Sequence, residues 1–303
     1  MENTIPSGKN DLKSSNSVYF GKILPRLDTR YVVLTGNLTL VLISVLFCYL
    51  QRSFAQISLT LGVAALTEYV LFRNLNKYQN QSFKDRWPSA LAEAASCLVL
   101  CRSKVLWVHP LMVVVAILSK YLIRRNERDH VFNPANFAIL MTLCFVSPVF
   151  FEFRVDDYSA GLYPLFHALV VGLVATSLAN VWRVTLGYFS AIIVFSALLF
   201  PISSLSAFVY ALGPEIGTSG VIFAFLMITD PKSAPRKPSS QWTFGAAIAL
   251  LHLVLRYEQF AYSRFVALFF ATAGFYFWDV LTTEVREFRA RSTANPLQEE
   301  ASA

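Results

Sequence analysis

The sequence predicts an all-α membrane protein that crosses the bilayer about ten times. Of its 303 residues, 55% are hydrophobic and only 15% are charged, too few to cover the surface of a soluble domain of this length. The mean hydropathy is +0.49. The apolar residues gather in runs of the length that spans a bilayer. An ordinary soluble globule, a disordered chain and a collagen-like fibre are therefore excluded.

Ten apolar segments are read as spans, several of them short. The predicted spans are 31–50, 55–72, 88–101, 105–123, 135–152, 162–181, 184–205, 216–229, 243–255 and 262–281. Segments 88–101, 216–229 and 243–255 fall below the roughly 20 residues of a full crossing, which is typical of helices that are tilted or broken beside a binding site. Polar breaks at 128–136 and 213–235 occupy similar places in two halves of the chain. The pattern favours two similar five-helix halves with broken helices.

The termini and the charge distribution predict the orientation. We divide the chain into an N-terminal segment 1–30, a membrane domain 31–285 and a disordered tail 286–303. The polar N-terminus lacks the apolar stretch of a cleavable signal peptide. With ten spans and a cytoplasmic N-terminus, 20 of the 26 Lys and Arg residues lie on the cytoplasmic side. This bias predicts an integral membrane protein with both termini in the cytoplasm. We expect its membrane to be the bacterial inner (plasma) membrane.

The first segment that carries chemistry is Asp129-His130-Val131-Phe132-Asn133-Pro134-Ala135-Asn136. Asn133 followed by Pro134 is a helix start, because Asn caps free N–H groups and Pro fits the first helical turn. Asn136 falls near the same face. The positive end of this helix suits a ring rich in carbonyl groups or an anion. A plain helix cap is the alternative reading from spacing alone.

The second segment runs from Gly213 to Pro231. Gly213, Gly217 and Gly220 allow close backbone approach. Thr229-Asp230-Pro231 ends the following apolar run, because Pro disfavours helix at the preceding residue. Asp230 is read as a cap, a hydrogen-bond acceptor or an ion ligand, although this tripeptide is most often only a turn.

Three acidic residues fall inside predicted spans: Glu68, Glu93 and Asp279. Charges inside a membrane are costly and usually face a polar interior, so they are candidates for an ion or proton path. The alternative is that Glu68 and Asp279 reach water at the cytoplasmic boundary, which leaves Glu93 as the best buried candidate. The four cysteines predict neither a disulfide framework nor a zinc site, and no motif for nucleotide hydrolysis or proteolysis occurs.

Taken in order, several strings resemble one family. They are Ser119-Lys120-Tyr121-Leu122, Phe132-Asn133-Pro134-Ala135, Phe223-Ala224-Phe225-Leu226-Met227-Ile228-Thr229-Asp230-Pro231, Phe244-Gly245-Ala246 and Trp278-Asp279. The ordered set is similar to the D subunit of the Rnf electron-transport complex and the B subunit of the sodium-translocating NADH:quinone oxidoreductase. The likeness covers roughly residues 30–285.

The resemblance implies about ten helices in two similar halves, flavins held in the membrane, and electron transfer coupled to Na⁺ or H⁺ movement. It implies one flavin bound non-covalently near the Phe-Asn-Pro helix start, and another esterified to a threonine between spans five and six. Here that stretch, 153–161, has no threonine, so covalent FMN is not expected. The asparagine that the family places three residues before Asn133 is His130 here.

The first hypothesis is therefore a membrane-embedded electron-transfer subunit that binds riboflavin or FMN non-covalently. The residues expected to hold it are His130, Phe132, Asn133, Asn136, Gly220, Thr229 and Asp230, with Phe132 packing on the ring. The alternatives are a transporter that keeps the fold without a redox cofactor, and a scaffold for other subunits. The expected partners are the lipid bilayer and other membrane electron-transfer subunits, not nucleic acid. The chain alone is at most one subunit of a translocase-type oxidoreductase.

Overall fold

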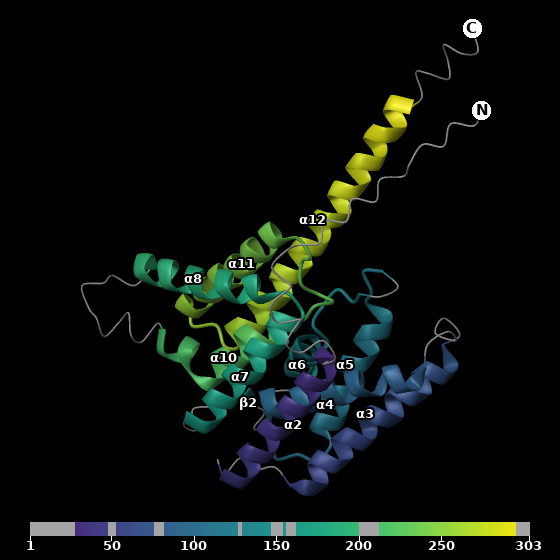
Figure 1. The fold of residues 1–303 in the computed structure, drawn as a ribbon, viewed down its shortest axis with the longest axis vertical. Helices are drawn as coiled ribbons and strands as arrows, with labels where there is room; N and C mark the ends of the chain where they lie inside the picture. The colour runs from purple at the N-terminus through teal and green to yellow at the C-terminus, as the bar shows by residue number, and fades with distance from the viewer. Residues whose placement is uncertain are drawn as a thin grey trace, which may run out of the picture.

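The computed structural model describes residues 28–47, 53–75, 82–126, 129–146, 154–155, 162–199 and 212–294. Its long helices are α2 (Thr29–Phe47), α3 (Phe54–Asn74), α4 (Trp87–Leu100), α5 (Val108–Leu122), α6 (Pro134–Phe145), α7 (Leu162–Leu178), α8 (Trp182–Leu199), α11 (Pro238–Tyr257) and α12 (Ser263–Ala294). Helix α10 (Thr218–Ile222) continues directly into the π-helical turn η3 (Phe223–Met227). A short helix η2 (Phe83–Asp85) and the antiparallel pair β1 (Cys101–Arg102) and β2 (Arg154–Val155) complete the described elements (Figure 1).

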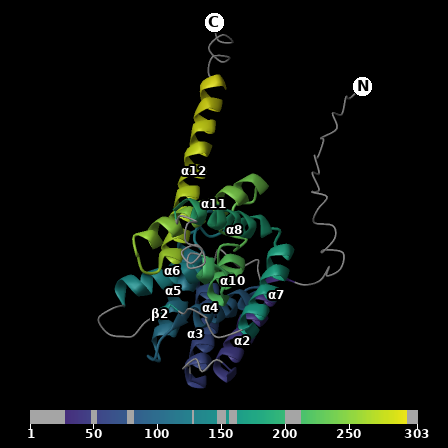
Figure 2. The same ribbon diagram turned by 90° about the vertical axis from the view of Figure 1, so that its left-hand side faces the viewer.

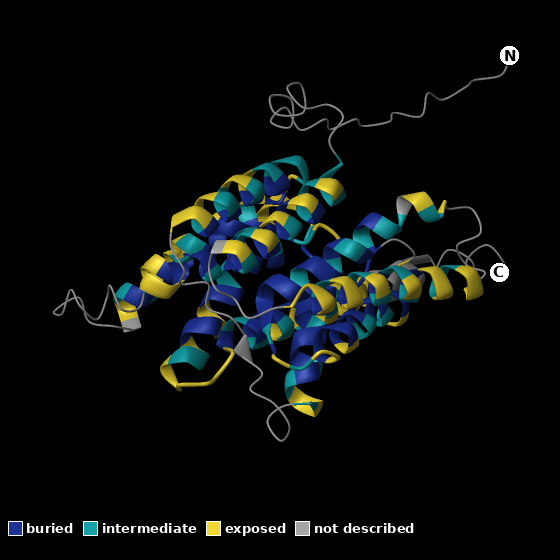
Figure 3. Ribbon diagram, turned by 90° about the horizontal axis from the view of Figure 1, so that it is seen from below, coloured by how far each residue is buried: buried dark blue, intermediate teal, exposed yellow. Residues whose placement is uncertain are grey.

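Each predicted span overlaps one helical segment, which confirms an all-α polytopic membrane protein. Helices α2, α3 and α12 contain stretches long and apolar enough to cross a membrane. Six further apolar helices are shorter, including α4 and the α10–η3 segment. Exposed positions lie on the outer faces of the helices and buried positions face the interior (Figure 3). This arrangement, with large apolar side chains turned outward, is that of an integral membrane protein.

The packing partners repeat between the two halves. In the first half, α2 packs on α4, α3 on α5 and α5 on α6. In the second half, α7 packs on α10 and η3, α8 on α11 and α11 on α12 (Figures 1 and 2). Helices α2 and α7 contact each other where the halves meet. The described residues thus form two similar five-helix halves.

The two short central helices begin and end at recognisable sequence features. Helix α4 has 14 residues with Pro88 in its first turn, and at 1.5 Å per residue it is only about 21 Å long. The α10–η3 segment is shorter still and ends before Thr229-Asp230-Pro231. Neither crosses a hydrocarbon core of about 30 Å. They correspond to 88–101 and 216–229, two of the three spans predicted to be short.

Two boundaries differ from the predictions. Helix α11 has 20 residues and begins at Pro238, whereas the predicted span was 243–255. Its polar first turn is helical because a proline starts it.

Helix α12 continues to Ala294, so residues 286–294 are helical and the prediction of a disordered tail from 286 was wrong there. Arg, Glu and Ala favour helix in this stretch, and the first breaker is Pro296. The outer turns of α12 project beyond the other helices (Figures 1 and 2).

Residues 1–27 and 295–303 lie outside the described residues. The same is true of most of the stretch 153–161, of which only Arg154 and Val155 are described. The predictions for the N-terminal segment, the distal tail and covalent flavin attachment therefore stay predictions.

Candidate functional site

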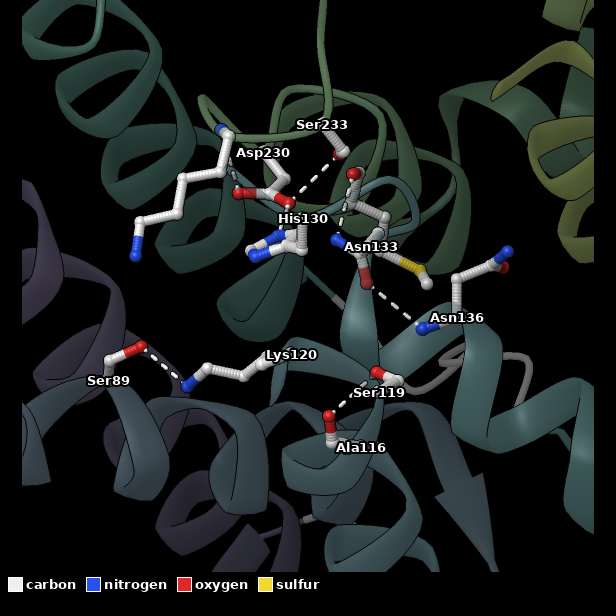
Figure 4. A network of polar contacts seen from close by, with 11 residues as sticks. Ser89, Ala116, Ser119, Lys120, His130, Asn133, Asn136, Asp230 and Ser233 are labelled. Atoms are coloured by element: carbon white, nitrogen blue, oxygen red, sulfur yellow. Dashed lines mark hydrogen bonds and ion pairs between the residues drawn. The ribbon is translucent and has the colours of Figure 1, made fainter. Parts of the chain in front are cut away.

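A contact between the two halves forms the centre of the candidate site. The loop between α5 and α6 presents His130, and the turn after η3 presents Asp230. The His130 Nε2 atom lies 2.7 Å from Asp230 Oδ2 (Figure 4). Only 7% of the His130 side chain and 16% of the Asp230 side chain are exposed. Two residues that are distant in the sequence are thus paired across the halves.

Asp230 collects hydrogen bonds from its own turn as well. Ser233 Oγ donates to Asp230 Oδ2 over 2.9 Å, and the Lys232 N–H donates to Oδ1 over 3.3 Å. Burial raises the pKa of Asp230, but the charge of His130 and the hydrogen bonds from His130, Ser233 and Lys232 outweigh it and bring the pKa to about 2. Asp230 is therefore ionised at neutral pH.

Asn133 is the predicted helix cap, and the side chains of Asn133 and Asn136 both form hydrogen bonds with the second half. The side-chain oxygen of Asn133 accepts the Asn136 N–H over 2.9 Å, which confirms Asn133 as the N-cap of α6. Its Nδ2 donates to the Met227 carbonyl over 3.1 Å, and Asn136 Nδ2 donates to the Phe265 carbonyl over 3.1 Å. The Asn136 Oδ1 atom is buried without a hydrogen-bond partner among the described residues. One acceptor beside the helix start thus remains unused.

The π-helical turn η3 has backbone carbonyls that side chains satisfy. Its defining hydrogen bond runs from the Ile228 N–H to the Phe223 carbonyl over 3.1 Å. Thr185 Oγ1 of α8 donates to the Ala224 carbonyl over 2.7 Å, and Thr229 Oγ1 donates to the Phe225 carbonyl. Asn133 of the first half donates to the Met227 carbonyl. Donors from both halves therefore hold this turn in place. The predicted site residue Thr229 is therefore occupied by a backbone contact.

A small polar cavity lies between the halves, beside Asp230. Its volume is about 90 Å³, and α2, α4, α7, η3 and the following turn line it. Its polar lining includes Glu93, Ser96, Asn133, Thr229 and Asp230. At about 30 Å³ for each molecule of liquid water, it has room for a few waters or one small cation. We call it the inter-half cavity.

Glu93 and Lys120 add ionisable groups at and near this cavity. Lys120 is buried at the end of α5, and its Nζ donates to Ser89 Oγ over 2.8 Å (Figure 4). The charges that act on Glu93 are those of Lys120, Asp230, His130 and Lys232. Sequence reasoning missed Lys120 as a site residue, although a lysine at the end of an apolar span was a usable signal.

The other predicted acids lie elsewhere. Glu68 is buried, and it accepts hydrogen bonds from Arg86 Nε over 2.9 Å and from Tyr121 OH over 2.6 Å. The Asp279 side chain is 54% exposed and pairs with Arg125, which agrees with the reading that it reaches water. The structure does not bring Glu68, Glu93 and Asp279 into one cavity.

Gly220 and Phe132 also take structural positions. A Cβ atom at Gly220 would lie 2.2 Å from the Glu215 carbonyl oxygen, so this glycine serves a close backbone contact. It is ten residues before Asp230, which places it about 15 Å away along a helix. The Phe132 ring stacks on Phe269, with centroids 4.6 Å apart and planes at 7°. One face of Phe132 is therefore already covered.

A second, larger cavity opens on the other side of the His130 loop. Its volume is about 930 Å³, within the range of cofactor sites. Its lining includes Val131 of the loop, Leu251 of α11, and Phe270 and Phe275 of α12. Its charged lining residues are Arg125, Asp129, Lys232, Arg236, Lys237 and Asp279. We call it the vestibule.

The two cavities differ in their fit to a flavin. The inter-half cavity is lined by three of the seven residues predicted to bind the flavin, Asn133, Thr229 and Asp230. Its volume is about a third of that of the smallest cofactor sites, roughly 300 Å³. The side-chain nitrogens of Asn133 and Asn136 are already engaged with backbone carbonyls. The vestibule has the volume, apolar and aromatic walls, and polar groups at its rim. The vestibule therefore has the volume for a ligand of flavin size, whereas the inter-half cavity does not, and none of the seven predicted binding residues lines the vestibule.

Comparison with known proteins finds a family model that matches part of the chain. Residues 164–272 match the sequence model of the NQR2, RnfD, RnfE family. The matched stretch runs from α7 to α12 and includes η3, Asp230 and much of the vestibule lining. No curated individual protein matches the chain. From α7 to α12 this membrane protein thus carries the sequence pattern of the NQR2, RnfD, RnfE family, as expected of a chain of the RnfD/NqrB type.

Proposed function

We propose that this protein is a membrane-embedded electron-transfer subunit that holds one flavin, riboflavin or FMN, non-covalently in the vestibule. The observation that carries the proposal is a cavity of about 930 Å³ beside the His130 loop. The family match over residues 164–272 supports the same class of function. Other membrane electron-transfer subunits would supply and remove the electrons.

The residues around the vestibule have distinct roles in this proposal. Phe270 and Phe275 offer apolar ring faces, and Ser240 and Thr243 offer hydroxyl groups at the start of α11. The loop that carries Val131 is held by the His130–Asp230 contact, so this part of the vestibule wall is fixed. A bound flavin supplies the redox chemistry, while the protein positions it and sets its surroundings.

The test is the visible absorption spectrum of the detergent-purified full chain before and after acid denaturation. The proposal predicts a flavin spectrum and flavin in the supernatant after denaturation. A Cβ atom at Gly274, which lines the vestibule, meets nothing within 4 Å. Gly274→Phe should therefore place a ring inside the vestibule and weaken flavin binding without a backbone clash.

Gly62→Phe is the matched control, because a Cβ there also meets nothing within 4 Å and Gly62 lies on α3. The control should retain the flavin. A folded wild-type protein that contains no flavin and takes up none would overturn the proposal. Flavin that stays with the precipitate would instead indicate a covalent link.

The inter-half cavity supports a second candidate function, which is cation movement. Its polar lining includes two carboxylates, Glu93 and Asp230, between helices too short to cross the membrane. Paired broken helices around a polar centre are typical of ion and substrate sites in transporters. In proteoliposomes, Glu93→Gln should abolish Na⁺ or H⁺ flux, while Glu258→Gln, an exposed residue at the end of α11, should not.

The flux measurement also separates the remaining alternatives. Flux without any flavin would favour a transporter that keeps only the fold. If neither flavin nor flux is found and the protein co-purifies with another membrane protein, the scaffold reading is favoured.

A further inference from the structure

The mouth of the vestibule has an excess of positive charge. Four of its lining residues are Lys or Arg and two are Asp. Each aspartate already holds one arginine: Asp279 pairs with Arg125, and Asp129 pairs with Arg236. Two lysines then remain without a matching carboxylate in the lining. An anion entering the vestibule would therefore meet net positive charge.

Lys237 and the start of α11 contribute most directly to this charge. Lys237 is exposed, and its ammonium makes no hydrogen bond or ion pair with any residue that the structure describes. It is the N-cap residue of α11, and its side chain makes no capping hydrogen bond. The positive end of this 20-residue helix is thus left open. Ser240, in the first turn, lines the vestibule.

Lys232 is the second lysine in the lining. Desolvation lowers its pKa and the charge of Lys120 lowers it further, while Asp230 and Glu93 act in the opposite direction. Lys232 is therefore shared between the inter-half cavity and the vestibule, and Lys237 is the lysine available to an anion. Arg236 has 76% of its side chain exposed, so its guanidinium retains donors that point to water.

The vestibule runs along the C-terminal half of the apolar stretch Ser263–Val285 of α12. Tyr276 and Trp278 of α12 line it, followed by Asp279. Tyr and Trp are enriched at the level of lipid headgroups. The distribution of Lys and Arg also predicts that the C-terminal end of α12 is cytoplasmic. A ligand with one apolar end and one anionic end would therefore match both parts of the cavity.

We propose that the vestibule mouth binds the phosphate ester of an amphiphilic ligand, through Lys237, Arg236 and the N-terminal turn of α11. The same chemistry is offered by the phosphate of FMN and by the headgroup of an anionic phospholipid. In the first case the inference rests on the proposed function and selects FMN over riboflavin. In the second case it is independent of it.

Binding titrations of the full chain in detergent distinguish the sources. Riboflavin differs from FMN only by lacking the phosphate, so quenching of flavin fluorescence compares them directly. If the cofactor supplies the phosphate, FMN binds about tenfold more tightly than riboflavin. Lys237→Gln should remove roughly fivefold of this preference, and Arg236→Gln with Lys237→Gln should remove it fully.

The test for a lipid as the source of the phosphate measures the thermal unfolding midpoint of the full chain in mixed micelles. If a lipid supplies the phosphate, dioleoylphosphatidylglycerol raises the midpoint, whereas phosphatidylcholine with the same chains does not, and the double variant abolishes the shift. Arg73→Gln is the control in both arms, because Arg73 is an exposed arginine in the last turn of α3 and does not line the vestibule.

The outcomes separate this inference from the proposed function. Equal binding of riboflavin and FMN, with no phosphatidylglycerol effect, overturns the phosphate site and leaves the flavin proposal standing. A phosphatidylglycerol effect without flavin binding supports the phosphate site and counts against the flavin. A phosphate preference that persists in the double variant overturns the assignment to these residues.

Discussion

Each half of the bundle buries one glutamate beside a tyrosine hydroxyl, and the two are held differently. In the first half, Glu68 of α3 accepts from Tyr121 and Arg86, and its Oε2 atom has no hydrogen-bond partner among the described residues. In the second half, Glu215 is surrounded from three helices. Tyr188 OH donates to it over 2.7 Å, and His252 Nε2 lies 3.0 Å away.

Two arginines complete the second cluster. Arg264 Nη2 lies 3.1 Å and Arg256 Nη1 lies 3.6 Å from Glu215 Oε1. Arg264 also donates to the Pro214 carbonyl and to Ser219 Oγ, on both sides of the break before α10. The second cluster thus fixes a broken helix, whereas the first leaves one carboxylate oxygen unused. Similar architecture in the two halves does not imply equal rigidity.

The largest expected effect comes from breaking the Glu215 cluster. Glu215→Gln leaves two partly buried arginines without their counter-charge, and it should lower the free energy of unfolding by about 3–5 kcal/mol. Glu68→Gln, which faces one arginine, should cost only about 1–3 kcal/mol. Thermal unfolding in detergent measures both, with the exposed Glu258→Gln as control. Equal losses from the two substitutions would contradict the comparison.

A smaller effect is expected where the halves differ in helix spacing. A Cβ atom at Gly245 of α11 would lie 2.1 Å from the Val184 carbonyl oxygen of α8, while Gly62 of α3 has open space. Gly245→Ala should destabilise the protein by about 1–3 kcal/mol because backbone must shift. Gly62→Ala should be neutral or stabilise it by up to about 1 kcal/mol. The same unfolding assay checks the pair, and a tolerated Gly245→Ala would show that α8 and α11 separate easily.

The smallest effect concerns the contact that joins the halves. The pKa of Asp230 is lowered from 3.8 to about 2. A lowered carboxyl pKa stabilises the folded state above the unfolded value, and this stabilisation is lost as pH falls toward the folded value. Asp230→Asn should therefore cost about 2 kcal/mol at pH 6, and the difference from wild type should shrink below about pH 4. A difference that stays constant between pH 6 and pH 3 would argue against the pairing with His130.

The spans and the helix starts could be predicted from local sequence. Asn133 and Pro134 begin α6 because capping and proline geometry act within one turn. Residue 286 was a poor choice for the end of α12, since charge alone does not stop a helix. Hydropathy likewise placed the start of α11 five residues late, because Pro238 and the polar first turn are outside the apolar run.

The candidate site could be predicted only in part. The sequence singled out His130, Asn133 and Asp230, and the structure brings them together. No local rule indicates that His130 would face Asp230, because a contact across the halves depends on how both are packed. The vestibule was missed for the same reason: its walls come from the His130 loop, α11 and α12, and none carries a motif by itself.

The π-helical turn η3 determines the angular position of everything that follows it. Each residue in an α-helix advances the chain by about 100° around the axis. Deletion of one residue within Phe223–Met227 would convert the turn to ordinary helix and rotate Thr229 and Asp230 by about that angle. Asp230 would then turn away from His130, and the Met227 carbonyl would leave Asn133. The presence of one residue in this turn therefore decides whether Asp230 of the second half faces His130 of the first.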